Sequence, residues 1–174
     1  MPADGSTPNA ARRIDQLMMP TLDELKATLE RDLPGASLTI DGGALWVPPA
    51  DLARVCRALK DDAALHLDYL ANVTAVDYPP ERIDVVYHLY SMSQKHGPVT
   101  LKVQLPRAHP VVASVTPLWR GAEFQEREVY DLYGVTFEGL PDLRRILMWD
   151  GFHGHPMRKD YVPEDQDAPQ PPRR

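Results

Sequence analysis

The last third of the chain contains the feature that most limits how the protein can fold. Residues 126–161 begin as a charged helix, reach Gly134, and continue as VTFEGLPDLRRILMWDGFHGHPMRKDY without helical or strand periodicity. A segment with so much fixed charge buries little apolar surface of its own, so it should not fold compactly alone. It nevertheless contains spaced apolar residues, among them Trp149 and the Ile146-Leu147 pair. We therefore expect an extended arm that wraps a partner.

Length and composition leave room for one folded unit besides this arm. The chain has 174 residues, and a domain of ~150 residues buries roughly 70% of its unfolded surface. No apolar run approaches the ~20 residues of a membrane span, and the start, MPADGSTPNAARRIDQ, lacks the apolar core of a signal peptide. The net charge is −6 with both signs interleaved, so nothing indicates nucleic-acid binding.

Cys56 is the only cysteine. A single thiol excludes an internal disulfide, and it also excludes a four-cysteine iron–sulfur or zinc site within this chain. Cys56 lies on the apolar face of an expected helix, with nothing nearby that would lower its pKa. We expect it to be a small core residue.

Residues 14–135 predict an α+β domain. Apolar periodicity predicts helices over 22–33, 52–60 and 122–133, a hairpin over 36–47, and strands over 67–78, 83–90 and 99–105. Thr21 and Glu24 form a capping box, Ser114 can cap a short turn, and Gly134 can end the last helix. Strands and helices do not alternate throughout, which favours two layers, with the helices on one face of a mostly antiparallel sheet. Residues 1–13 should be a mobile leader, and residues 136–174 the extended partner-binding arm.

Three linked sequence blocks carry a family resemblance: EREVYDLYGVTF, GLPDLRRIL and GHPMRKDY. Together they resemble the signature of the C-type (30 kDa-type) subunit of respiratory complex I, the proton-pumping NADH:quinone oxidoreductase. The match covers about the last third of the chain. One position departs from the pattern, because the family usually has Gly-His-Pro-Asp-Leu and this chain has Leu140 in the His position.

The resemblance implies a non-catalytic subunit of the peripheral arm of that complex, on the cytoplasmic side of the inner (plasma) membrane. It implies that the chain clamps the D-type subunit, which helps to form the quinone site, and supports assembly. It also implies no cofactor in this chain, since FMN, the iron–sulfur clusters and the quinone belong to neighbouring subunits. The alternative is the homologous subunit of a ferredoxin-using relative or of an energy-converting membrane-bound hydrogenase, because nothing in this chain identifies the electron donor.

The positions that match the family motif would serve the interface and the fold rather than chemistry. They are Glu126, Arg127, Glu128, Asp131, Gly134, Pro141, Asp142, Arg144, Arg145, Gly154, His155, Pro156, Arg158, Lys159, Asp160 and Tyr161.

The acidic helix is the first candidate for catalysis. Glu126, Glu128 and Asp131 lie close together and could provide a general acid or base. Arg127 lies among them, however, and a guanidinium lowers the pKa of nearby carboxyl groups and keeps them ionised. We expect Glu126 and Arg127 to hold the helix to the arm through charge-assisted hydrogen bonds.

His153 and His155, with Asp150, are a candidate metal site, but no Cys or Glu-x-x-His completes a ligand shell. A free-standing soluble enzyme that uses this turn or the acidic helix is the rival from another functional class. The apolar residues of the arm argue against it, because such a strip left uncovered promotes aggregation.

The pairs Arg144-Arg145 and Arg158-Lys159 could bind phosphate, but no glycine-rich turn between a strand and a helix accompanies them. Asp142 and Asp160 interrupt the same strip, which favours salt bridges to a partner protein over an anion trap. Arg144 is expected to be one half of a buried charge pair at that interface.

Overall fold

A five-stranded sheet forms the centre of the described chain. In the computed structural model, which describes residues 19–163, the strands pair in the order β1-β2-β5-β4-β3. Their bounds are β1 Thr39–Asp41, β2 Ala44–Trp46, β3 Tyr69–Tyr78, β4 Arg82–Ser91 and β5 His96–Pro106. Every pair is antiparallel except β2 beside β5, which is parallel. The expected leader, 1–13, and residues 164–174 of the expected arm lie outside the described residues.

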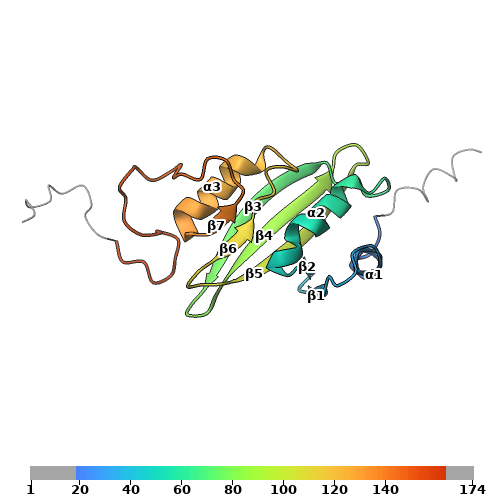
Figure 1. Cartoon of the computed structure of the whole chain (residues 1–174), viewed down its shortest axis with the longest axis horizontal. Helices are drawn as coiled ribbons and strands as arrows, with labels where there is room; N and C mark the ends of the chain where they lie inside the picture. The colour runs from blue at the N-terminus through green and yellow to red at the C-terminus, as the bar shows by residue number, and fades with distance from the viewer. Residues whose placement is uncertain (1–18, 164–174) are drawn as a thin grey trace, which may run out of the picture.

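Within residues 19–163, three α-helices and a 3₁₀ turn complete the folded unit, which we call the body. They are α1 Leu22–Asp32, η2 Pro49–Asp51, α2 Leu52–Asp61 and α3 Ala122–Tyr133. The capping box of Thr21 and Glu24 is present at the start of α1, and Gly134 ends α3 with a left-handed φ of 74°. Figure 1 shows α2 and α3 on one side of the sheet. The predicted two-layer α+β fold with a mostly antiparallel sheet is confirmed.

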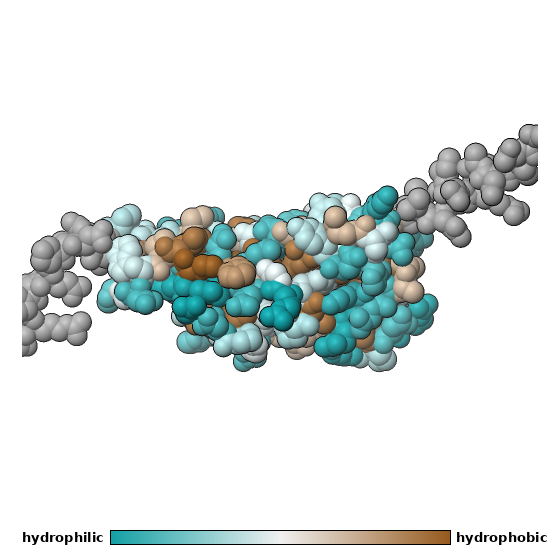
Figure 2. Space-filling model, turned by 90° about the horizontal axis from the view of Figure 1, so that it is seen from above, coloured by the Kyte–Doolittle hydropathy of each residue, from teal (hydrophilic) through white to brown (hydrophobic). Residues whose placement is uncertain are grey.

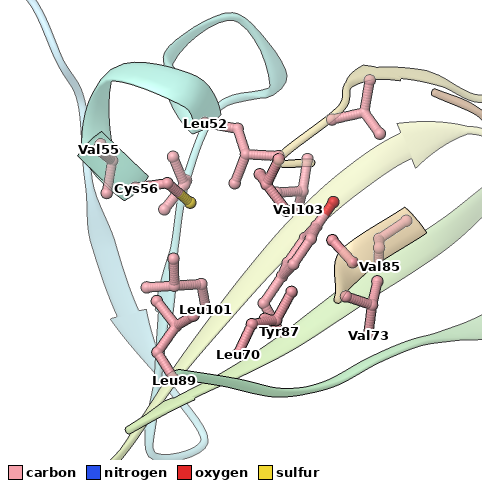
Figure 3. Packing of buried hydrophobic residues seen from close by; sticks show 14 of the residues in the cluster. Leu52, Val55, Cys56, Leu70, Val73, Val85, Tyr87, Leu89, Leu101 and Val103 are labelled. Carbon is pink, nitrogen blue, oxygen red and sulfur yellow. The ribbon is translucent and has the colours of Figure 1, made fainter. Parts of the chain in front are cut away.

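The core lies between this face of the sheet and the helices. Alternate side chains of β4, such as Val85 and Tyr87, are buried on it, because successive strand residues point to opposite faces. Figure 3 shows these side chains in one buried cluster with Leu52 and Cys56 of α2. The Cys56 side chain is fully buried, and burial raises the pKa of its thiol, so Cys56 is an inert core residue.

A small second sheet extends the body beyond α3. β6 Val111–Ala113 pairs in parallel with β7 Thr136–Glu138, and Phe137 of β7 is buried in the core. From sequence, residues 136–138 were expected in the arm, because a three-residue strand has no periodicity that could reveal its pairing. We keep the name arm for residues 139–163, which Figure 1 shows as an extended loop beside α3 at one end of the molecule.

None of the helices within residues 19–163 combines the length and the apolar character that a membrane crossing requires.

Candidate partner-binding site

One buried carboxylate, that of Asp131 on α3, organises the arm. Its Oδ1 accepts a hydrogen bond from Nη1 of Arg145 at 2.6 Å. Its Oδ2 accepts from three successive backbone N–H groups, those of Ile146, Leu147 and Met148, at 3.0, 2.8 and 2.8 Å. The N–H groups of this turn therefore converge on the helix, while the Ile146 and Leu147 side chains are exposed to solvent.

The pKa of Asp131 reflects these bonds. Burial alone raises it, but the N–H of Met148, the Arg145 guanidinium and the other two amides outweigh burial, so the pKa lies below its ordinary value. Hydrogen bonds to the ionised form stabilise that form. Asp131 is therefore a fixed anion that holds the arm rather than a proton donor.

Arg127 supplies the opposite charge from the same helix. Its Nε and Nη2 donate to the backbone carbonyls of Arg144 and Arg145 at 3.2 and 3.1 Å. The Arg127 side chain is almost completely buried. These bonds therefore replace the hydration that its guanidinium loses on burial. Together Asp131 and Arg127 bind the amides and the carbonyls of one short stretch of the arm.

Glu126 does not bind the arm, which corrects the expectation from sequence. Its buried carboxylate accepts from Ser114 Oγ at 2.6 Å, from the N–H of Val115 at 2.7 Å and from Thr116 Oγ1 at 3.1 Å. Burial raises its pKa despite these three bonds, whereas the sequence predicted a lowered pKa. The adjacent Arg127 guanidinium points to the arm and not to Glu126. It therefore does not offset the rise in the Glu126 pKa that burial causes.

The arm also caps the end of α3. The last carbonyls of a helix have no partner within the helix. Here the carbonyl of Asp131 contacts His155 Nδ1 at 3.0 Å, that of Leu132 accepts from the N–H of Met157 at 3.1 Å, and that of Tyr133 accepts from Arg158 Nε at 2.7 Å. A carbonyl can only accept, so His155 Nδ1 is the donor in this contact, and burial lowers the pKa of the His155 ring. The arm therefore supplies hydrogen-bond partners for the last carbonyls of α3.

Gly134 makes this approach possible. A Cβ at this position would lie 2.5 Å from Nε2 of His155 and 3.0 Å from Nη2 of Arg158. Glycine is thus required here by the close approach of the arm as well as by the left-handed backbone.

The far end of the arm is tied to β3. Arg107 donates from Nε and Nη2 to the two oxygens of Asp77 at 2.6 and 3.1 Å, and it also binds the carboxylate of Asp160. The N–H of Lys159 donates to Asp77 Oδ2 at 2.8 Å. Asp160 was expected to pair with another protein, but in this structure its partner is the body of its own chain.

Sequence reasoning missed Asp77 and Arg107. A signal for Asp77 was present, since it shares the inward face of β3 with Val73 and Ala75. An acid at such a position needs a buried partner, but the pattern does not indicate which residue supplies it.

Arg144 is not part of a buried charge pair. Its side chain is 69% exposed and pairs with Asp142, two residues away, at 2.8 Å. The buried pair is instead Arg145 with Asp131, whose side chains are 17% and 0% exposed. Arg144 and Arg145 are adjacent, and the turn directs one to solvent and the other to α3.

The three acidic residues of α3 do not converge on one site. Glu128 is exposed, whereas Glu126 and Asp131 are buried and bind different segments. Pro141 and Gly154 are exposed, Pro156 is half-buried, and Leu140, in place of the family's His, is buried in the core. Over residues 19–163, no three His, Cys, Asp or Glu side chains gather as a metal site.

A row of apolar side chains remains on the outside of the arm. Its exposed members, which we call the apolar row, are Ile146, Leu147, Trp149, Met157 and Val162. Phe152 supports it from within the arm, edge-on to Trp149 and stacked on Tyr161. Figure 2 shows an apolar patch toward the end of the molecule at which Figure 1 shows the arm. The arm thus presents exposed apolar side chains on a backbone that the body holds in place.

Comparison with known proteins decides the family. The sequence model described as "Respiratory-chain NADH dehydrogenase, 30 Kd subunit" matches residues 45–167, which include most of the sheet, α3 and the arm. The chain belongs to this family. The resemblance seen in the three sequence blocks is therefore confirmed.

Two relatives show how far the likeness extends. A C-type subunit of NADH-quinone oxidoreductase from Rhizobium meliloti (strain 1021) is 48% identical over 120 residues, which are 68% of this chain and 65% of the relative. The C-type subunit of NADH-quinone oxidoreductase from Moorella thermoacetica (strain ATCC 39073 / JCM 9320) is 45% identical over 143 residues, which are 80% of this chain and 95% of the relative. The match thus spans just under two thirds of the first relative and nearly all of the second.

Two solved structures share the fold. A structure described as "Nqo5 of the trypsin-resistant fragment (1-134)" is 33% identical with a TM-score of 0.55, and the match covers 76% of this chain and 98% of the fragment. A chain of the membrane-bound sulfane sulfur reductase, an archaeal respiratory membrane complex, has a TM-score of 0.65 over 80% of this chain and 85% of its own length. At 24% identity, the second likeness shows the fold alone.

Proposed function

We propose that this chain is the C-type subunit of a proton-translocating NADH:quinone oxidoreductase and works there as a non-catalytic part of the peripheral arm. It would lie on the cytoplasmic side of the membrane, and its own arm would bind the quinone-site (D-type) subunit. The flavin, the iron–sulfur clusters and the quinone site would belong to the neighbouring subunits.

The observation that carries this proposal is the apolar row on an anchored backbone. A binding segment that is already ordered avoids the entropy loss of ordering on association. Asp131 and Arg127 bind the backbone beneath Ile146 and Leu147, and Leu147 is 57% exposed. Exposed apolar rows of this kind mark protein interfaces. The relatives' names support the identity of the complex.

The alternative keeps the fold and changes the reaction. The sulfane sulfur reductase neighbour has this fold in a respiratory complex with another substrate, so a ferredoxin-using relative or a membrane-bound hydrogenase would accommodate the same body and arm. In both interpretations the electron donor would bind another subunit. The subunits that co-purify with this chain would therefore distinguish the two complexes. Flavin- and NADH-binding subunits favour the first proposal, whereas a nickel-site large subunit favours hydrogenase.

The experiment is to tag the chain in its native host, solubilise the membranes gently, and identify what co-purifies. Leu147→Ser and Trp149→Ser should lower the amount of recovered complex and its NADH:quinone activity. Both positions are exposed, so the free energy of unfolding of the chain should stay within about 0.5 kcal/mol of wild type.

Met92→Ser is the matched control, because Met92 is an equally exposed apolar residue in the loop between β4 and β5. Its complex should be recovered at the wild-type level. If all three variants assemble equally, the apolar row is not the binding surface. A wild-type chain that is recovered alone would overturn membership of the complex.

A further inference from the structure

The sheet has a second face, turned away from the core, that the proposed function does not use. Cross-strand register places Val76, Asp84 and Gln104 side by side in one row, and Val86 and Lys102 in the next. We call this surface the open face. Its members are Trp46, Val76, Tyr78, Arg82, Lys102 and Gln104, of which Val76, Tyr78 and Gln104 are exposed.

Cations over aromatic rings dominate the open face. Lys102 Nζ lies 5.3 Å from the centre of the Trp46 ring, and Arg82 Cζ lies 4.7 Å from that of Tyr78. Within the described part of the chain, Lys102 forms no ion pair, whereas Arg82 is paired with the buried carboxylate of Asp84, with 3.3 Å between Nε and Oδ1. The Trp46 ring holds Lys102 in place without neutralising its charge.

A hollow of about 400 Å³ borders the same face. Trp46, Arg82 and Gln104 line it together with polar residues of the first strand, Thr39 and Asp41. Two buried N–H donors of these walls, Trp46 Nε1 and Arg82 Nε, make no hydrogen bond among the described residues, although Arg82 Nε lies 3.3 Å from Asp84 Oδ1. A segment that brings carboxylate oxygens to the hollow would complement the cations of the open face.

The open face is continuous with the arm. Lys159 of the arm lies 5.4 Å from the centre of the same Tyr78 ring that Arg82 covers, and the Lys159 N–H is bound to Asp77 of β3. Lys159 forms no ion pair within residues 19–163. A neighbour bound to the arm would therefore reach the open face without leaving the surface of the molecule.

We propose that the open face is a second docking surface that binds an acidic, carboxylate-bearing segment of a neighbouring protein in the complex. The inference rests on the proposed function, because it requires membership of a complex, but it assigns a surface separate from the apolar row. A second copy of this chain is a poor occupant, since two such faces would bring Lys102 of each close to the cations of the other. Nucleic acid is disfavoured by the net charge of −6.

The test uses the full chain in its assembled complex. A photo-crosslinking residue at Gln104 should capture a peptide of another subunit that contains Asp or Glu. Lys102→Glu should lower the recovered complex several-fold, and Lys102→Gln should lower it less. Arg31→Glu is the matched charge reversal on α1, where the Arg31 side chain is 72% exposed, and it should leave recovery unchanged. Circular dichroism checks that each variant is folded.

A charge swap gives the sharpest result. Replacing the captured carboxylate by Lys should restore the recovery of the Lys102→Glu variant. Normal assembly of Lys102→Glu, with no crosslink from Gln104 to another subunit, would overturn this inference and leave the proposed function intact. Crosslinks only to a second copy, or Lys102-dependent binding to vesicles of anionic phospholipid, would also overturn it. If the wild-type chain recovers no complex, the proposed function fails first and this inference fails with it.

Discussion

Asp131 and Arg145 form a buried ion pair, with 2.6 Å between Oδ1 and Nη1, that joins α3 to the arm. The same carboxylate accepts from the three amides that follow Arg145 in the chain. One side chain thus binds both the Arg145 guanidinium and the backbone of the turn that presents Ile146 and Leu147. The proposed partner surface is consequently built before any partner binds.

Asp131→Ala should release the arm. It leaves Arg145 and three inward-facing amides without an acceptor, and breaking a buried pair on one side destabilises by on the order of 3 kcal/mol. Urea unfolding should show this loss, and timed trypsin digestion with mass spectrometry should show faster cleavage in the arm. Asp142→Ala is the control, since its pair with Arg144 is exposed and should change stability by less than about 1 kcal/mol. Cleavage of the Asp131→Ala arm at the wild-type rate would contradict this anchoring role.

Arg144 and Arg145 should behave differently although they are neighbours. Arg145→Ala should approach the effect of Asp131→Ala, whereas Arg144→Ala should change stability by less than about 1 kcal/mol, because Arg144 is exposed. A double-mutant cycle between Asp131 and Arg145 should give a coupling free energy of about 1–3 kcal/mol in urea unfolding. Additive single-mutant effects would show that the two residues act independently.

Gly134→Ala should destabilise more than Gly139→Ala. Both glycines have positive φ, 74° and 84°, so both substitutions carry a backbone strain of about 1–2 kcal/mol. Only at Gly134 would the new Cβ meet another residue, His155, because nothing lies within 4 Å of the corresponding position at Gly139. Thermal unfolding of the two variants provides the measurement. Both carry the backbone strain, so the additional fall in Tm of Gly134→Ala reports the displacement of the arm. Equal losses would mean that His155 moves aside freely.

Glu126 should give the stability a pH dependence of defined sign. Its pKa in the folded protein is raised by burial above the ordinary value of 4.5, so over the interval above 4.5 the folded state binds a proton that the unfolded state has released. The free energy of unfolding should therefore fall as the pH rises from 4.5 through the raised pKa.

Glu126→Gln removes this titration and keeps a side chain that can hydrogen-bond Ser114 and Val115. Urea unfolding of both proteins over the same pH range should show that the difference in stability shifts in favour of the variant as the pH rises. The same pH slope in both proteins would mean that Glu126 does not titrate in this range.

Much of the fold follows from local sequence patterns. The leucines at helical spacing after Thr21, the strand alternation around Tyr87 and the left-handed Gly134 each act through hydrogen bonds and burial within a few residues. Such patterns were sufficient for the helices, the long strands and the fold class. The three sequence blocks near the end were sufficient for the family.

The contacts of the arm were decided by the tertiary structure. The sequence indicated that Glu126 and Arg127 are structural, but not that one binds the 114–116 loop and the other the arm, because adjacent helix residues point in different directions. It did not connect Asp77 with Arg107 and Asp160, which are far apart along the chain and meet only when β3 and the arm pack together. Local patterns determine which segments become helices and strands, whereas a buried charge takes the partner that packing brings to it.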